Sequence, residues 1–175
     1  MGYVHDTGMS QFIPPTLIGA SAGTWTLAVA SNVWSNNRTA ADAAFTLYVP
    51  ALIPSNSGAL KGAMLKSIEL MYSVGTADMD DIATVKLYKD TLQAGAASGS
   101  GTINTATEIT GITLDTGHDT AAERKAQDEH RMKVTLDTPA YIDNDESYHL
   151  EVVCDAAAGS VFKVFGAIIN YTLRV

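Results

Sequence analysis

An alternation of apolar and polar residues with a period of two recurs along this chain and limits what it can fold into. The clearest case is RMKVTLD (131–137), where Met132, Val134 and Leu136 alternate with charged or hydroxylated residues. Successive side chains of a β-strand point to opposite faces, so this pattern predicts a half-buried strand with these three side chains in the core.

Seven further segments show apolar patterns that predict strands. Turn-rich connections separate most of them, and no sustained 3.6-residue apolar stripe indicates a long helix; Ala121 to Glu129 fits at most a short polar one. We therefore predict an all-β fold, an antiparallel β-sandwich of about eight strands that is jelly-roll-like. The additional predicted strands cover residues 24–31, 43–51, 65–74, 82–90, 108–114, 147–155 and 160–175.

The length of 175 residues suits one domain. Residues 1–23 show no clear periodicity, and Pro14-Pro15 breaks any helix there. The sequence therefore predicts an extended N-terminal arm (1–23) followed by a single β-sandwich domain (24–175).

Charge and composition exclude several classes of partner. The net charge of −8 repels phosphate backbones and anionic membrane surfaces, so we expect neither nucleic acid nor membrane as a partner. Cys154 is the single cysteine, which excludes an intramolecular disulfide. The N-terminal residues lack the basic start and apolar run of a signal peptide, so we expect synthesis in the host cytoplasm.

Several short motifs resemble catalytic or metal-binding sites. Ser21 in GASAG (19–23) fits the letters of a nucleophile elbow but lacks the strand before it and the helix after it. His118 and His130 would approach each other if the charged segment 115–130 folds back, so a metal site there is the alternative to a solvated loop. The acidic turns 78–81 and 143–146 lack the spacing of an EF-hand, although calcium favours such clusters. We predict no catalytic residue, no cofactor and no metal needed for folding.

Three stretches carry a resemblance to a known group of proteins. They are GYVHDTGMSQFIPPTLIG, DTGHDTAAERKAQDEHRMKVTLDTPAYIDNDESY and LEVVCDAAAGSVFKVFGAIINYTL. Together they resemble uncharacterised virion proteins of tailed phages and environmental phage-like genomes, which are of jelly-roll or related sandwich type. The resemblance implies a location in the virion and a role like that of a decoration protein, and it includes no catalytic motif.

The first hypothesis is a non-enzymatic structural virion protein, either a head decoration protein or a self-assembling coat component. Its expected partners are its own copies, in a trimer or larger assembly, and a major capsid protein. A solvated arm would be poor in large apolar residues, so we predict that those of the arm lie at a subunit interface. The rival is that the arm adds a strand to its own sheet. The predicted interface residues are Tyr3, Met9, Phe12, Ile13, Leu17 and Ile18.

Two other functions remain open at this point. A carbohydrate- or surface-binding β-sandwich module of a phage fibre is the alternative, and it predicts exposed aromatic side chains. A small hydrolase ranks last, because no nucleophile and base can be paired in the sequence.

Overall fold

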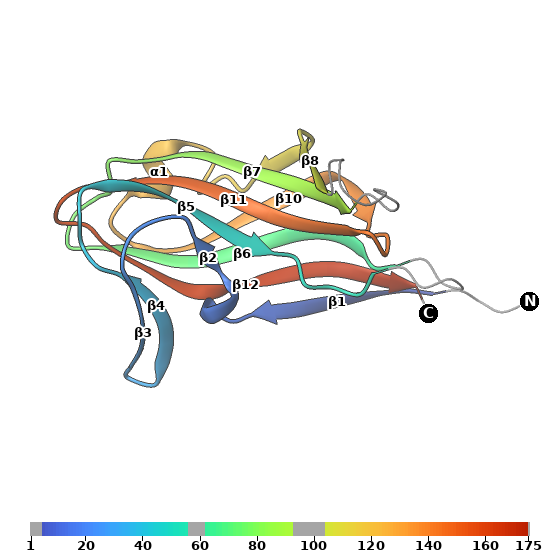
Figure 1. Ribbon diagram of the computed structural model, residues 1–175, viewed down its shortest axis with the longest axis horizontal. Coiled ribbons are helices and arrows are strands. Elements are labelled where there is room, and N and C mark those ends of the chain that lie inside the picture. The colour runs from blue at the N-terminus through green and yellow to red at the C-terminus, as the bar shows by residue number, and fades with distance from the viewer. Residues whose placement is uncertain (1–4, 56–61, 93–103, 175) are drawn as a thin grey trace, which may run out of the picture.

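Two antiparallel sheets pack face to face in the computed structural model, which describes residues 5–55, 62–92 and 104–174 (Figure 1). The larger sheet contains, in spatial order, β3 (Trp25–Ala30), β4 (Val33–Arg38), β12 (Val161–Arg174), β6 (Met64–Gly75), β10 (Glu129–Tyr141) and β9 (Ile112–Leu114), and β1 (Asp6–Ile13) also pairs with β12. The smaller sheet contains β2 (Gly19–Ala20), β5 (Ala43–Pro50), β11 (Glu146–Ala156), β7 (Asp81–Leu92) and β8 (Asn104–Ile109). The predicted all-β antiparallel sandwich is confirmed.

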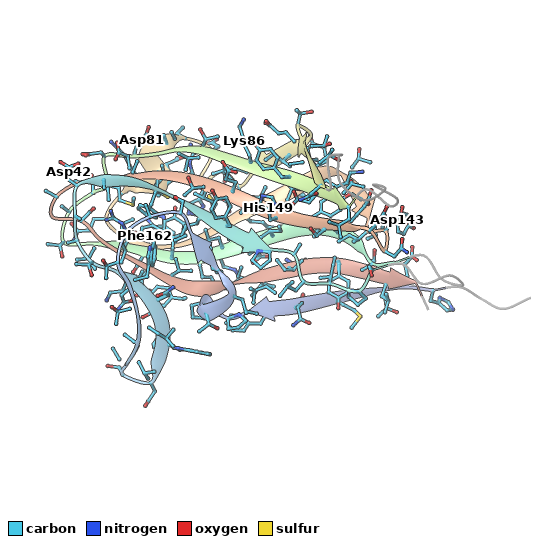
Figure 2. The ribbon with its side chains drawn as sticks, in the orientation of Figure 1. Asp42, Asp81, Lys86, Asp143, His149 and Phe162 are labelled. Carbon is cyan, nitrogen blue, oxygen red and sulfur yellow. The ribbon has the colours of Figure 1, made fainter. Side chains whose placement is uncertain are left out.

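The core lies between the sheets and follows the predicted alternation. Met132, Val134 and Leu136 are buried, and the odd-numbered positions of β10 between them face outward. Phe162 of β12 points between the two sheets (Figure 2). Full burial of one such side chain stabilises the fold by roughly 1.5–3 kcal/mol. The alternating faces of β6 and β11 are buried in the same way, through Ile68, Leu70, Tyr72, Val74, Tyr148, Leu150, Val152 and Cys154.

One strand lies where the sequence indicated only a connection. Residues 31–42 contain β4, and Trp34 belongs to this strand. β3 and β4 are joined by Ser31 and Asn32, which both have positive φ (51° and 66°). Positive φ at both central residues makes a type I′ turn, whose twist matches that of paired strands.

The predicted strand 108–114 contains parts of two strands in the structure. β8 ends at Ile109 in the smaller sheet, and β9 begins at Ile112 in the larger one. Most of the connection between the predicted strands 82–90 and 108–114 lies outside the described residues.

The predicted arm joins the chain's own sheets, as the rival interpretation had it. β1 pairs with β12 from Asp6 opposite Arg174 to Ile13 opposite Ala167. β2 adds a short strand to β5. Between β1 and β2, Pro15–Leu17 form a single 3-10 turn, η1. Ile13 and Ile18 belong to the same core cluster as the long strands. The physical reason is that these two apolar side chains gain more by burial in their own sandwich than by staying in solvent.

A glycine fixes how closely β1 approaches β12. Gly166 has φ 136°, a conformation that side chains other than glycine rarely adopt. A Cβ atom at this position would lie 2.7 Å from the carbonyl oxygen of Ile13 and 2.7 Å from the ring of Phe12. Because Gly166 has no side chain, the Phe12 ring can pack directly against the backbone of β12.

Helix α1 (Ala121–Lys125) is the short helix expected in the charged segment. A capping box between Thr120 and Glu123 starts it. Its Arg124 is buried and donates from Nε to the carbonyl oxygen of Ile82 (3.0 Å), a hydrogen bond that fixes the helix on β7. No helix among the described residues is long and apolar enough to cross a membrane.

Candidate binding face on the larger sheet

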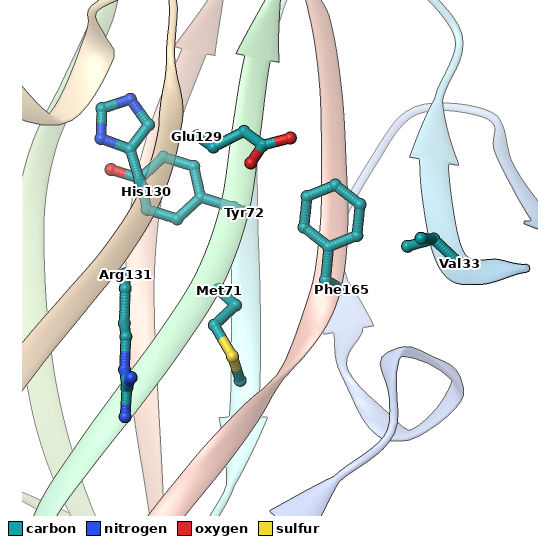
Figure 3. Close-up of a pocket in the computed structure, with 7 residues that line it drawn as sticks. All are labelled: Val33, Met71, Tyr72, Glu129, His130, Arg131 and Phe165. Carbon is teal, nitrogen blue, oxygen red and sulfur yellow. The ribbon is translucent and has the colours of Figure 1, made fainter. Parts of the chain in front are cut away.

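The outer face of the larger sheet contains a hollow of about 470 Å³. Its lining comes from four strands, so backbone hydrogen bonding of the sheet sets the spacing of its side chains. Phe165 stands at a β-bulge, where the register of β12 on β6 shifts between Val164 and Gly166. Figure 3 shows the Phe165 ring on β12, between Met71 on one side and Val33 on the other. The lining residues are Val33, Met71, Tyr72, Glu129, His130, Arg131 and Phe165.

Phe12 extends the apolar part of this face toward β1. Its ring lies against Gly166, which pairs with Met71 of the hollow, and Phe12 is 52% exposed. An aromatic side chain so exposed on a sheet face can bind a ligand by its ring.

A row of hydrogen-bonded polar side chains crosses the same face. Ser10 of β1 donates to Asn170 Oδ1 (2.7 Å), and Asn170 Nδ2 donates to Glu69 Oε1 (2.8 Å) and to Ser67 Oγ (3.2 Å). Arg131 of β10 donates from Nε to Glu69 Oε2 (2.7 Å). Four strands thus each contribute a polar group to one continuous network, which we call the polar row (Ser10, Asn170, Ser67, Glu69 and Arg131).

Glu69 is the centre of the polar row. Its side chain is 9% exposed, whereas that of its partner Arg131 is 66% exposed. Lys133 lies on the other side, with Nζ 3.9 Å from Glu69 Oε1. A nearly buried carboxylate needs such partners, because a buried unpaired charge is strongly destabilising. The pairing also orients the Arg131 guanidinium while leaving it accessible to a ligand.

His130, which lines the hollow, contacts a second histidine. His118 Nδ1 donates to Asp115 Oδ1 (2.6 Å), His118 Nε2 lies 3.2 Å from His130 Nδ1, and His130 Nε2 donates to the Ala126 carbonyl oxygen (2.9 Å). A carboxylate and a carbonyl oxygen can only accept, so His118 Nδ1 and His130 Nε2 are the donors in the two outer hydrogen bonds. The His130 ring also stacks on Tyr72, with centroids 4.6 Å apart.

The segment 115–130 does fold back, but the structure does not arrange a metal site there. The direct contact between the two rings uses the nitrogens that would face a shared ion. Among the described residues, no group of three or more His, Cys, Asp or Glu side chains is placed to hold a metal.

Tyr72 lines the hollow, and its side chain belongs to the buried core. Burial, and secondarily the neighbouring Cys154, raises the pKa of Tyr72 far above its usual value. The Tyr72 hydroxyl donates to the carbonyl oxygen of Arg124 (2.8 Å). Tyr72 therefore links the hollow to α1 and remains protonated at neutral pH.

The residues predicted for a subunit interface are divided by the structure. Met9, Phe12 and Leu17 are exposed large apolar side chains, whereas Ile13 and Ile18 are buried in the chain's own core. The folded domain therefore does not offer Ile13 or Ile18 to a neighbour. Tyr3 lies outside the described residues, and an interface role for the other three remains a prediction.

Ser21 and the acidic turns form hydrogen bonds and ion pairs within the fold. Ser21 Oγ accepts a hydrogen bond from the backbone N–H of Thr46 (2.9 Å), as part of the contact with β5. In the acidic turns, Asp78 Oδ1 accepts from the N–H of Gln127 (2.8 Å), and Glu146 binds Lys89 (2.7 Å).

Known proteins offer only distant likenesses. No family model and no curated protein matches this chain. Its fold is similar to that of TmCBM61 in complex with beta-1,4-galactotriose (TM-score 0.37, 9% identity, 96% of this chain and 88% of that one). It is also similar to the xylan-binding module CBM86 from Roseburia intestinalis (TM-score 0.34, 7% identity, 93% and 96%). A polyomavirus VP1 pentamer matches with a TM-score of 0.18, 8% identity and coverage of 97% and 94%. At these values the likenesses say nothing about what this chain binds.

Proposed function

We propose that this chain is a non-catalytic binding module that holds a carbohydrate chain against the outer face of its larger sheet. The observation that supports this is the hollow, whose lining combines the Phe165 ring with the charged side chains of Arg131 and Glu129 on one sheet. A pyranose ring has one apolar and one polar kind of surface, which match these two kinds of side chain. Its C–H face packs against an aromatic ring, and its hydroxyl groups exchange charge-assisted hydrogen bonds with such side chains.

The surroundings of the hollow favour an extended and uncharged saccharide. The polar row continues from Arg131 to Ser10 across four strands, and Phe12 offers a second exposed ring next to it. The charges of Arg131 and Lys133 are offset by those of Glu69 and Glu129. A neutral polysaccharide would therefore meet donors and acceptors without a net field of either sign.

Isothermal titration of the full chain with xylan, galactan and a β-glucan, and with polygalacturonate as an acidic contrast, tests this proposal. We expect a neutral polysaccharide to bind, and Phe165→Ala to weaken its binding at least about tenfold, or about 1.4 kcal/mol. Lys86→Ala is the matched control, because Lys86 is a half-exposed residue on the opposite, smaller sheet (Figure 2). Binding that Phe165→Ala leaves unchanged, or no binding to any of the polysaccharides, would contradict the proposal.

A second candidate is the structural virion protein, acting by assembly of its own copies. The exposure of Met9, Phe12 and Leu17 on and beside the outer edge strand β1 favours it. Deletion of residues 2–18 would remove Ile13 and Ile18 from the core, so substitution of the three exposed residues by serine is the sharper test. This candidate expects a trimer or larger species by light scattering that the triple variant no longer forms.

A further inference from the structure

The β3–β4 hairpin extends away from the sandwich (Figure 1). At its base, Trp25 packs edge-on against Phe45 and Phe162, with ring centroids 5.5 and 6.3 Å away. One face of the hairpin therefore begins inside the core. Farther along this face the smaller sheet no longer covers it.

Three large apolar side chains continue this face into solvent. Leu27 and Val29 follow Trp25 at intervals of two, and Val29 pairs directly with Trp34 of β4, so these side chains share one face. Leu27 is 48% exposed, Val29 70% and Trp34 43%. We call Leu27, Val29 and Trp34 the hairpin face.

The hairpin face lacks what a folded ribbon normally needs. β4 pairs with β12 only at Asn36–Arg38, so the outer part of the hairpin is a two-stranded ribbon. Such a ribbon is only marginally stable in water, and a β-layer buries its apolar face against a second layer. Residues 24–37 include no charged residue, although the chain as a whole has a net charge of −8. Two copies that each carry this net charge repel each other, and the hairpin is a place where they can meet without bringing like charges together.

We propose that the hairpin face packs against the same face of a second copy about a two-fold axis. Each hairpin then supplies the second layer that the other lacks, in an isologous contact. Taking about 150–250 Å² for a large side chain, the exposed parts of the three residues amount to roughly 300 Å² per copy. This is less than half of the roughly 800 Å² per partner of a standard interface, so the dimer is reversible, with a Kd between about 1 µM and about 1 mM.

The dimer is compatible with the binding face but does not depend on it. Val33 lines the hollow from the opposite side of the hairpin, because Val33 pairs with Ala30 and not with Val29. Both hollows therefore remain open in the dimer, and two linked sites would bind a polymeric ligand with avidity.

Sedimentation velocity of the full chain, from about 1 µM to about 1 mM to bracket the expected Kd, tests the proposal. We expect a concentration-dependent dimer, and a monomer throughout for Val29→Asp. Ala30→Asp is the matched control: it introduces the same charge at the neighbouring exposed residue, on the opposite face, and should dimerise like the unmodified chain. Thermal unfolding checks that both variants fold, which the exposure of both sites favours.

Three results would overturn the proposal. The first is an unmodified chain that is monomeric up to about 1 mM, the weak limit of the expected affinity. The second is equal loss of the dimer in both variants, which would place the contact elsewhere on the hairpin. The third is a dimer, or a larger assembly, that Val29→Asp does not disrupt.

Discussion

Replacement of Gly166 by alanine tests how β1 is attached to the sandwich. The new Cβ would lie 2.7 Å from both the Ile13 carbonyl oxygen and the Phe12 ring, where real Cβ contacts do not occur. Backbone strain at φ 136° costs about 1–3 kcal/mol, and forcing an extra carbon into a packed site costs about 1–3 kcal/mol more. We expect Gly166→Ala to lower the free energy of unfolding by about 2–6 kcal/mol, a large part of the total for a domain of this size.

Urea unfolding followed by circular dichroism measures this change. Gly8→Ala is the matched control, since Gly8 lies on the same β1–β12 ladder and has no atom within 4 Å of its would-be Cβ. It should leave stability within about 1 kcal/mol of the unmodified chain. A companion variant, Phe12→Ala combined with Gly166→Ala, should recover part of the loss, because it removes the clash with the Phe12 ring and leaves the backbone strain and the clash with the Ile13 carbonyl. If Gly166→Ala is as stable as Gly8→Ala, the close approach of β1 to β12 is wrong.

Three further predictions concern the core and the charged segment. Val134→Asp buries an unpaired charge between the sheets and should cost several kcal/mol in urea unfolding; a soluble and equally stable variant would refute the inward orientation of Val134. Burial raises the pKa of the Cys154 thiol, so the folded protein should not react with Ellman's reagent at pH 8 and should react stoichiometrically in urea. Rapid reaction of the native protein would show that Cys154 is accessible. Thr120→Ala removes the capping box of α1 and should lower stability by about 1 kcal/mol; no change would show that Arg124 alone holds the helix.

The sequence was sufficient for the architecture because alternation reports directly on burial. Met132, Val134 and Leu136 of β10 lie inside as the period of two predicts. The same rule did not identify β4, because Asn36 and Asn37 are typical of turns and lie in a strand here through pairing with β3 and β12. Pairing partners far apart in the chain are not encoded in local periodicity.

The candidate binding face was less accessible to sequence reasoning for the same reason. Phe165 sits at a bulge, which breaks the alternation that would have assigned it to the outer face. The polar row joins Ser10 to Asn170 and Asn170 to Glu69, contacts that depend on strand order alone. Arg131 was visible as the polar side of a strand, but nothing local distinguished it from an ordinary solvated residue.

The N-terminal segment shows what composition alone does not predict. Its large apolar residues indicated burial, which holds for Ile13 and Ile18. Composition does not say whether the buried surface belongs to the same chain or to a neighbour. The register of β1 on β12 decides that question for Ile13, because it places this residue opposite Ala167 of the core.

The most direct test of the binding proposal is a titration of the ¹⁵N-labelled chain with a neutral oligosaccharide of xylose, galactose or glucose, followed by amide chemical shifts. We expect the changes to concentrate on β6, β10 and β12, around Met71, Arg131 and Phe165, and to leave the amides near Lys86 on the smaller sheet unaffected. Changes confined to the smaller sheet or to the hairpin face, or no changes with any of these sugars at millimolar concentration, would contradict a carbohydrate site on the larger sheet.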